Sequence, residues 1–169
     1  MLFRPNRHYT FASFRPRAGN CLARARSIAY SNACGVSMDC ALLLLAGRPG
    51  SGKTHLLHAT VNKAYANENI RSSSILSSRR LLEELVTAES YYDDLPQLLA
   101  RWREDDLLAI DDIDDLFAHR VWADVLLGLL QERIALRKRS VVTLTLSKAP
   151  DIPGPLCDFI NQRRAYALI

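Results

Sequence analysis

Short apolar runs and segments of helical periodicity alternate along this chain. The run Ala41–Ala46 is continuous and is stopped by glycine, which is typical of a central parallel strand covered on both faces. Shorter runs predict strands at Ser72–Ser77, Leu107–Ile110 and Val141–Leu146, and Ala165–Ile169 is a candidate fifth strand. These runs are expected to supply the strands of a single sheet.

Helices are predicted between the strands. Asn20 is a good N-cap for a helix over Leu22–Tyr30, and Pro96 marks the start of another short helix. Apolar residues recur at helical spacing in Lys53–Ala66, Leu81–Val86 and Val121–Leu136. Strands that alternate with helices in this way predict an α/β fold with a parallel sheet, in which ligands bind at the carboxyl ends of the strands.

Length and composition indicate one globular domain. The chain has 169 residues, of which 49% are hydrophobic and 24% are charged. A chain of this size buries about two thirds of its unfolded surface. No apolar run approaches the roughly 18 to 20 residues that cross a bilayer, so no membrane partner is expected.

Charge is distributed unevenly. Residues 1–80 carry a net charge of +10, residues 81–124 carry −10 and residues 125–169 carry +4. A basic N-terminal half suits a phosphate-bearing partner, but a solvated arginine-rich face explains it equally well. The first 31 residues hold six arginines and no acid, a composition that also fits an organellar transit peptide.

The four cysteines give no sign of a metal or disulfide framework. They include no C-x-x-C pair and no histidine at metal-ligand spacing, so a zinc site is not expected. No secretory signal is evident near the start of the chain, and we therefore expect reduced thiols and a cytoplasmic location.

The strongest chemical signal is a glycine-rich loop. Gly47-Arg-Pro-Gly-Ser-Gly-Lys53-Thr54 matches G-x-x-x-x-G-K-[ST], directly after a predicted buried strand and at the start of a predicted helix. Glycines let the backbone wrap a phosphate, while the loop N–H groups and the helix N-terminus supply a positive field. Lys53 would reach the β- and γ-phosphates, and the Thr54 hydroxyl would ligate Mg²⁺.

A second signal lies 58 residues beyond Lys53, where the apolar run Leu107–Ile110 ends in Asp111 and Asp112. A strand that ends in carboxylates beside a P-loop is the Walker B arrangement, with Asp111 holding Mg²⁺ and Asp112 orienting or deprotonating the attacking water. Asp114 and Asp115 extend the acidic run and are interpreted as a solvated face.

Four stretches resemble the DnaA replication initiators of the AAA+ ATPases and their shorter relative Hda. They are Tyr9–Phe14 with Asn20, Gly47–Ala59, Asp106–Ile113 and Leu144–Pro150. The Lys-Thr-His-Leu-Leu-His-Ala continuation of the loop is more specific than a P-loop alone. The resemblance spans nearly the whole chain.

The resemblance implies an AAA+ P-loop NTPase, a three-layer α/β/α sandwich with a five-stranded parallel sheet. Residues 1–20 would form an arm near the nucleotide base, and residues 21–169 the nucleotide-binding core. Such an arm is not cleaved, which counts against a transit peptide, while ordinary core anchoring remains an alternative for Phe11 and Phe14. The candidate nucleotide-binding residues are Gly47, Arg48, Pro49, Gly50, Ser51, Gly52, Lys53, Thr54, His55, Phe11, Phe14, Asn20 and Ser147.

Three positions near the C-terminal end bear on hydrolysis. Ser147 falls where the initiators usually have their sensor 1 acid, and Phe159 falls where they often have an arginine. Arg163 matches the arginine finger that acts in trans on a neighbouring subunit's ATP, with Arg164 and a plain surface arginine as alternatives. The candidate catalytic residues are thus Asp112, Lys53 and Arg163.

The resemblance predicts an ATP-binding, slowly hydrolysing protein with Mg²⁺, acting in the initiation of DNA replication or its regulation. Its partner would be a DnaA-type initiator or another AAA+ subunit. The chain ends at Ile169, before the family's lid and helix-turn-helix domain, so sequence-specific duplex binding is not expected. Weak contact with single-stranded DNA stays open. The alternatives are a helicase-loader or transposition-accessory ATPase and a non-catalytic interaction module or fragment.

Overall fold

The computed structural model describes residues 5–15, 20–35, 41–68, 70–90, 94–146, 154, 156–158 and 166–168. Helices and strands alternate along most of this length, as the apolar pattern predicts. The elements are α1 (Asn20–Ala33), β1 (Leu42–Gly47), α2 (Lys53–Ala66), β2 (Ser73–Ser77), α3 (Ser78–Ser90), α4 (Asp94–Glu104), β3 (Leu107–Asp111), the 3₁₀ helix η1 (Ile113–Ala118), α5 (Arg120–Ala135), β4 (Arg139–Thr145) and β5 (Tyr166–Leu168).

The strands form one parallel sheet. Four of them make up its body in the order β2-β3-β4-β1, and the three-residue β5 pairs with β1 at the edge. Because β4 lies between β3 and β1, the carboxyl ends of β1 and β3 stand on either side of it. The glycine-rich loop and the acidic turn therefore come to the same edge of the sheet.

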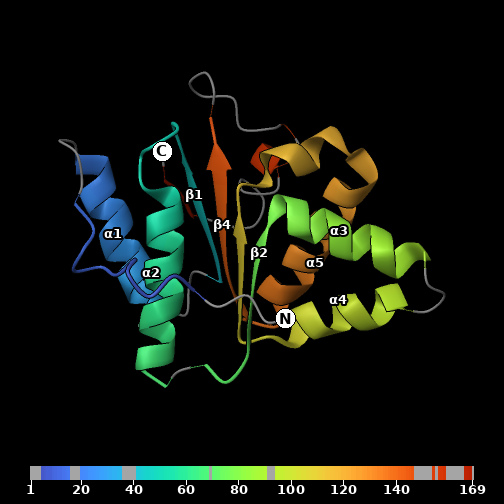
Figure 1. Cartoon of the computed structure of the whole chain (residues 1–169), viewed down its shortest axis with the longest axis horizontal. Helices are drawn as coiled ribbons and strands as arrows, with labels where there is room; N and C mark the ends of the chain where they lie inside the picture. The colour runs from blue at the N-terminus through green and yellow to red at the C-terminus, as the bar shows by residue number, and fades with distance from the viewer. Residues whose placement is uncertain are drawn as a thin grey trace.

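Helices cover both faces of the sheet (Figure 1). α1 and α2 lie on one face, and α3, α4 and α5 lie on the other, so the expected three-layer α/β/α sandwich is confirmed. All six residues of β1 are buried. This explains why Leu42–Gly47 has no polar alternation, since both faces of a central parallel strand meet a helical layer.

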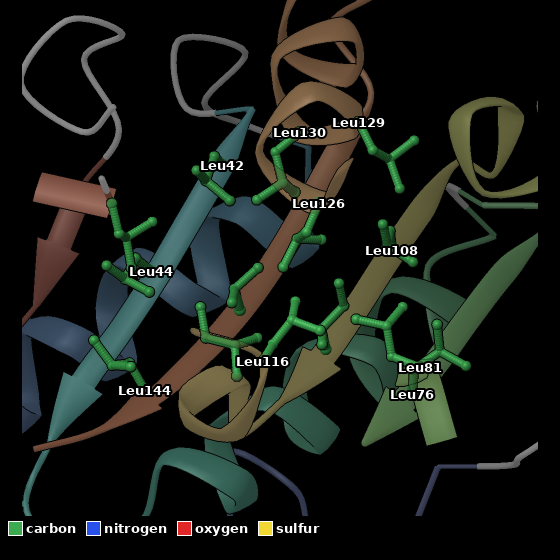
Figure 2. Close-up of a cluster of buried hydrophobic side chains, with 14 of the residues drawn as sticks. Leu42, Leu44, Leu76, Leu81, Leu108, Leu116, Leu126, Leu129, Leu130 and Leu144 are labelled. Carbon is green, nitrogen blue, oxygen red and sulfur yellow. The ribbon is translucent and has the colours of Figure 1, made fainter. Parts of the chain in front are cut away.

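One hydrophobic core fills the space between the sheet and α3, α4, α5 and η1. Figure 2 shows its leucines converging from the strands and from the helices above them. Every second residue of β1 points into this core, and the intervening leucines point into the other. The labelled members are Leu42, Leu44, Leu76, Leu81, Leu108, Leu116, Leu126, Leu129, Leu130 and Leu144. Full burial of a leucine stabilises the fold by roughly 1.5–3 kcal/mol.

The second core lies under α1 and α2 and includes the N-terminal segment, residues 5–15. Phe11 and Phe14 of this segment are buried with Leu43 and Leu45 of β1. The ring of Phe11 also meets Tyr30 of α1 edge to face, with ring centroids 5.3 Å apart. The segment is thus part of the folded domain, as core anchoring predicts, and its place near the nucleotide base stays a prediction.

Several element boundaries differ from the expectation by a few residues, and α1 and η1 are two cases with a physical reason. Asn20 lies inside α1, which runs on to Ala33, three residues beyond the predicted end at Tyr30. The buried side of this helix consists of alanines, at Ala25, Ala29 and Ala33. Alanines give only a weak apolar periodicity, so the pattern did not predict the last turn. The 3₁₀ helix η1 was not predicted either, because the acidic run at its start looks like a solvated turn.

A fully buried arginine joins α5 to the sheet end opposite the site. Arg133 donates through Nε to Ser140 Oγ at 2.9 Å and through its terminal nitrogens to the carbonyls of Trp102, Asp105 and Arg139. Burial lowers its pKa to about 10, so the group stays charged at neutral pH.

Among the described residues, no helix has both the length and the apolar character needed to cross a membrane.

Candidate functional site

The glycine-rich loop joins β1 to α2 through two left-handed residues. Gly50 has φ +73° and Gly52 has φ +94°, a region that residues with a Cβ rarely adopt. Gly52 is also crowded, because a Cβ there would lie 2.7 Å from the Phe14 Cε2 atom. These geometries explain why the sequence has glycine at both places.

Lys53 opens α2 and turns back over the loop. Its Nζ donates to the Gly47 carbonyl and to the Arg48 carbonyl, each at 2.9 Å. Partial burial lowers the pKa of Lys53, and the carboxylates of Asp112, Asp114 and Asp111 oppose that shift. The two carbonyls thus hold the ammonium group against the loop backbone, and an anion bound at the loop would replace them as its partner.

Thr54 and Asp111 join the loop to the end of β3. The Thr54 hydroxyl lies 3.1 Å from Oδ1 and 3.0 Å from Oδ2 of Asp111, to which it donates. The hydroxyl of Thr143 on β4 donates to the same Oδ1 at 2.6 Å. The glycine-rich loop and the end of β3 are thus joined by hydrogen bonds between residues 57 positions apart, as the predicted Walker A and Walker B pairing requires.

Asp112 follows in a left-handed conformation, with φ +60° and ψ +66°. Its backbone N–H donates to Thr143 Oγ1 at 2.7 Å. Hydrogen bonds from Asp114 and then from Thr145 lower the pKa of the Asp112 carboxyl, with a smaller contribution from the charge of Lys53. The Asp112 side chain is exposed and ionised, which suits a group that orients water.

Asp114 is not part of a solvated face, so that interpretation was wrong. Its Oδ2 accepts the Thr145 N–H at 2.8 Å, and its side chain also pairs with Asp112. Burial, and then the hydrogen bond with Asp112, raises the pKa of Asp114 to about 6. Sequence reasoning missed this residue because only the 3₁₀ turn of η1 brings the third acid of the run back to β4.

The segment 5–15 is held on the same helix that carries Lys53 and Thr54. His55 Nε2 contacts the Thr10 carbonyl at 2.9 Å, and its ring stacks on Tyr9 with centroids 4.8 Å apart. One turn on, His58 Nδ1 accepts the Asn6 N–H at 3.2 Å. The two histidines thus hold the N-terminal segment against α2. In the described part of the chain, no group of three or more His, Cys, Asp or Glu side chains is arranged to hold a metal ion.

Asn62 completes this face of α2. Its Nδ2 donates to the Asn6 carbonyl at 2.9 Å and to the Tyr9 carbonyl at 2.8 Å. His55, His58 and Asn62 all bond to the N-terminal segment, and their spacing along α2 puts them on one helix face.

A cavity of about 300 Å³ opens between this segment and the loop. One wall is formed by Gly50, Ser51 and Gly52, and the other by Ser13, Phe14 and Arg15, with His55 between them. The ring of Phe14 meets His55 edge to face at 5.2 Å. The loop therefore faces an aromatic and cationic wall on one side and the acidic turn of β3 on the other.

The match to known proteins agrees with this geometry. The family model of the bacterial DnaA ATPase domain matches residues 5–157. The chain belongs to this family.

One curated relative in this family is the chromosomal replication initiator protein DnaA of Geotalea daltonii. It is 32% identical over 167 residues, which are 97% of this chain and 36% of that protein. The chain spans about a quarter to a third of the length of the curated DnaA relatives that it matches.

Solved structures show the same fold. A structure of the replication initiator DnaA bound to AMPPCP and single-stranded DNA superposes with a TM-score of 0.78 at 18% identity, covering 97% of this chain and 50% of that one. The DnaC helicase loader gives a TM-score of 0.71 at 18% identity, covering 96% and 98%. The fold of this DnaA-family domain is thus shared by initiators and a helicase loader.

Some predicted site residues lie outside the described part of this DnaA-family domain. Ser147, Phe159, Arg163 and Arg164 are among them. Asn20 is the first residue of α1, but its side chain is not among those that the structure describes. The predicted roles of these residues remain predictions.

The oxygen ligands of this DnaA-family site fit a magnesium ion. Mg²⁺ prefers oxygen ligands and is usually bound by one or two carboxylates together with substrate phosphates. The Thr54 hydroxyl and the Asp111 carboxylate are such oxygens and already lie within 3.1 Å of each other.

Proposed function

We propose that this DnaA-family domain binds ATP together with Mg²⁺ at the loop Gly47–Thr54. The observation that carries the proposal is the contact between Thr54 and Asp111, because it brings a phosphate-binding loop and an acidic strand end into one site. A glycine-rich loop alone would support only anion binding. The carboxylate beside it adds a place for the metal that accompanies a nucleoside triphosphate.

Each part of the site has a role in this proposal. The loop N–H groups and the N-terminus of α2 hold the phosphates. Lys53 exchanges its hydrogen bonds to the Gly47 and Arg48 carbonyls for bonds to the phosphates. The cavity beside Phe14 and His55 is the proposed place of the base, and its lining by Ser13, Phe14 and Arg15 supports the assignment of the N-terminal segment to the nucleotide base. The aromatic ring and the histidine offer a flat surface for stacking.

Thr54 and Asp111 would hold Mg²⁺. When bound, the ion neutralises charge on the phosphate oxygens. Asp112, exposed and kept ionised by its neighbours, orients the attacking water or accepts its proton.

Hydrolysis by one subunit alone is proposed to be slow. Arg163 is the candidate finger that stabilises charge on the phosphoryl group in a neighbouring subunit, so turnover needs a DnaA-type initiator or another AAA+ subunit. The replication role, in initiation or its regulation, is supported by family membership and by the initiators among the relatives. Contact with single-stranded DNA is a further part of the proposal, supported by the initiator structure bound to it.

Nucleotide affinity tests the proposal directly. Labelled ATP and ADP are titrated with Mg²⁺ into the wild type, Lys53→Ala and Lys63→Ala. Lys63 is a matched control, because it lies on the same helix but over the ring of Tyr30, away from the loop. We expect micromolar or tighter binding that falls at least about a hundredfold in Lys53→Ala and stays unchanged in Lys63→Ala. A wild type that binds neither nucleotide would leave an interaction module or a fragment as the better description.

A helicase-loader role is the second candidate, favoured by the likeness to DnaC over 98% of that chain. The two roles differ in their partner. Pull-downs with a DnaA-type initiator and with a replicative helicase distinguish them, and ATPase assays of each mixture show whether the partner stimulates turnover. A transposition-accessory role predicts binding to neither.

A further inference from the structure

Thr143 is a buried hydroxyl at the centre of the site. It lies on β4, between β3 and β1, and its exposure is 1%. Its neighbours Val142 and Leu144 are apolar and buried. A valine has the same shape and would fill the same space without removing a hydroxyl from water, so a threonine here needs hydrogen bonds that compensate for burial.

Both hydrogen bonds go to the acidic turn. Asp112 N–H lies 2.7 Å from Thr143 Oγ1, and Asp111 Oδ1 lies 2.6 Å from it. A backbone N–H can only donate, so the hydroxyl accepts from Asp112 through a lone pair. Its single proton is then available for Asp111. One side chain therefore fixes a carboxylate oxygen of Asp111 and the backbone of Asp112 at once.

The backbone of Asp112 needs such a constraint. Its φ of +60° is left-handed, a conformation that a residue with a Cβ keeps only when its surroundings hold it there. Its N–H donates to the hydroxyl of Thr143, which lies one residue beyond the Ile110–Val142 pair of β3 and β4 and is itself paired with Leu45 of β1. The direction in which the Asp112 carboxylate leaves the turn depends on that backbone conformation.

Thr54 offers Asp111 a bond of a different kind. Its side chain is exposed at the start of α2, and a hydroxyl that donates its proton to Asp111 keeps both lone pairs for a metal. Asp111 is therefore bonded by Thr54 from the exposed side and by Thr143 from the buried side.

We propose that Thr143 is a positioning residue that holds Asp111 and Asp112 in their working arrangement from the buried side, while Thr54 bonds the same Asp111 carboxylate from the exposed side. The inference rests on the proposed function, since it assigns Thr143 a role in the response of nucleotide binding to Mg²⁺. It also makes a claim about the acidic turn itself that needs no nucleotide.

The first test uses the protein without nucleotide. Thr143→Val removes the hydroxyl and keeps the shape, while Thr143→Ser keeps the hydroxyl. Hydrogen exchange of the Asp112 amide, followed by NMR, should become about tenfold faster in the valine variant and stay near the wild-type rate in the serine variant. Thr60→Val is the matched control, because Thr60 is a buried threonine whose hydroxyl bonds only to Leu56 O in its own helix.

The second test compares ATP affinity with and without Mg²⁺. In the wild type, Thr143→Ser and Thr60→Val, we expect Mg²⁺ to tighten ATP binding. In Thr143→Val the metal-free affinity should be unchanged, because Lys53 and the loop are intact, while the gain from Mg²⁺ should fall at least about tenfold. A residue with a purely structural role would weaken both affinities alike.

The outcomes separate the two claims. An Asp112 amide that exchanges equally in all variants overturns the positioning role, whatever the nucleotide data show. A full Mg²⁺ response in Thr143→Val also overturns it, even with a loosened amide. A wild type that binds no ATP overturns the proposed function and the metal part of the inference, and the amide result alone then decides whether Thr143 holds the turn.

Discussion

The ring of Phe14 lies directly over the backbone of Gly52, so that a Cβ on this glycine would meet the Phe14 Cε2 atom at 2.7 Å. The N-terminal segment and the phosphate-binding loop thus come close together at Gly52. The contact links the cavity proposed for the base to the loop proposed for the phosphates. Of the three loop glycines, Gly52 has the least room for a Cβ.

Gly52→Ala should destabilise the domain by about 2–3 kcal/mol, from left-handed strain and displacement of Phe14. Gly50→Ala is the matched control, since Gly50 has φ +73° but nothing within 4 Å of its added Cβ. Urea unfolding measures both. In a Phe14→Ala background the cost of Gly52→Ala should approach that of Gly50→Ala, and equal costs in both backgrounds would rule out the ring contact.

Asp114→Asn should change how stability depends on pH. The pKa of Asp114 is raised to about 6 in the folded protein. Between about pH 4 and pH 6 this carboxyl group therefore binds more protons in the folded state than in the unfolded state. The free energy of unfolding of the wild type therefore loses this contribution as pH rises through that window. Asparagine resembles the protonated carboxyl and does not titrate.

The variant should accordingly gain stability relative to the wild type as pH rises, with a constant difference above about pH 7. Urea unfolding at several pH values checks this, and Asp115→Asn, at an exposed neighbouring position, is the control. A stability difference that does not change with pH would mean that Asp114 titrates as an ordinary carboxyl group.

Arg133→Met should cost about 3 kcal/mol or more, because several buried carbonyls lose their donor at once. Methionine keeps much of the length and apolar stem of arginine, so the loss reports the hydrogen bonds. Arg79→Ala serves as comparison, since its ion pair with Glu83 is exposed and should be worth less than about 0.5 kcal/mol. Thermal or urea unfolding gives both values, and similar small losses would contradict the role assigned to Arg133.

Asn62→Ala should loosen the N-terminal segment without unfolding the domain. The amide of Asn62 donates to two carbonyls of this segment, those of Asn6 and Tyr9. Loss of two such bonds should raise hydrogen exchange in residues 5–15 by about tenfold. Mass spectrometry follows the exchange, with Asn67→Ala as control, because Asn67 caps the C-terminus of α2 and its side chain donates to Cys34 Sγ and not to this segment. Unchanged exchange would show that the aromatic contacts and the hydrogen bonds to His55 and His58 hold the segment without Asn62.

Much of the fold could be predicted because its signals are local. The apolar run of β1, the glycines of the loop and the acids after β3 each lie within a few residues, and parallel topology brings them to one edge. Thr143 and Asp114 could not be predicted in the same way. Their roles depend on the register of β4 against β3 and on the turn of η1, which arise only when distant segments pack.

Arg133 illustrates a second limit. In the sequence it is one basic residue near the end of a long helix, where a charge is expected to face water and the helix dipole. Only the packing of α5 against the sheet shows that its guanidinium meets carbonyls from α4 and β4. Local patterns identify which residues are charged, but not which charges the fold encloses.

The C-terminal end of β4 sets the relative positions of several residues of the site. It bonds to Asp111 and Asp112 through Thr143 and to Asp114 through the Thr145 N–H, and Leu146, the next residue, donates its N–H to the Gly47 carbonyl. Deleting one residue of this strand would shift every one of these bonds and exchange its two faces. Among descendants of this domain, substitutions in β4 should therefore be far better tolerated than any change in its length.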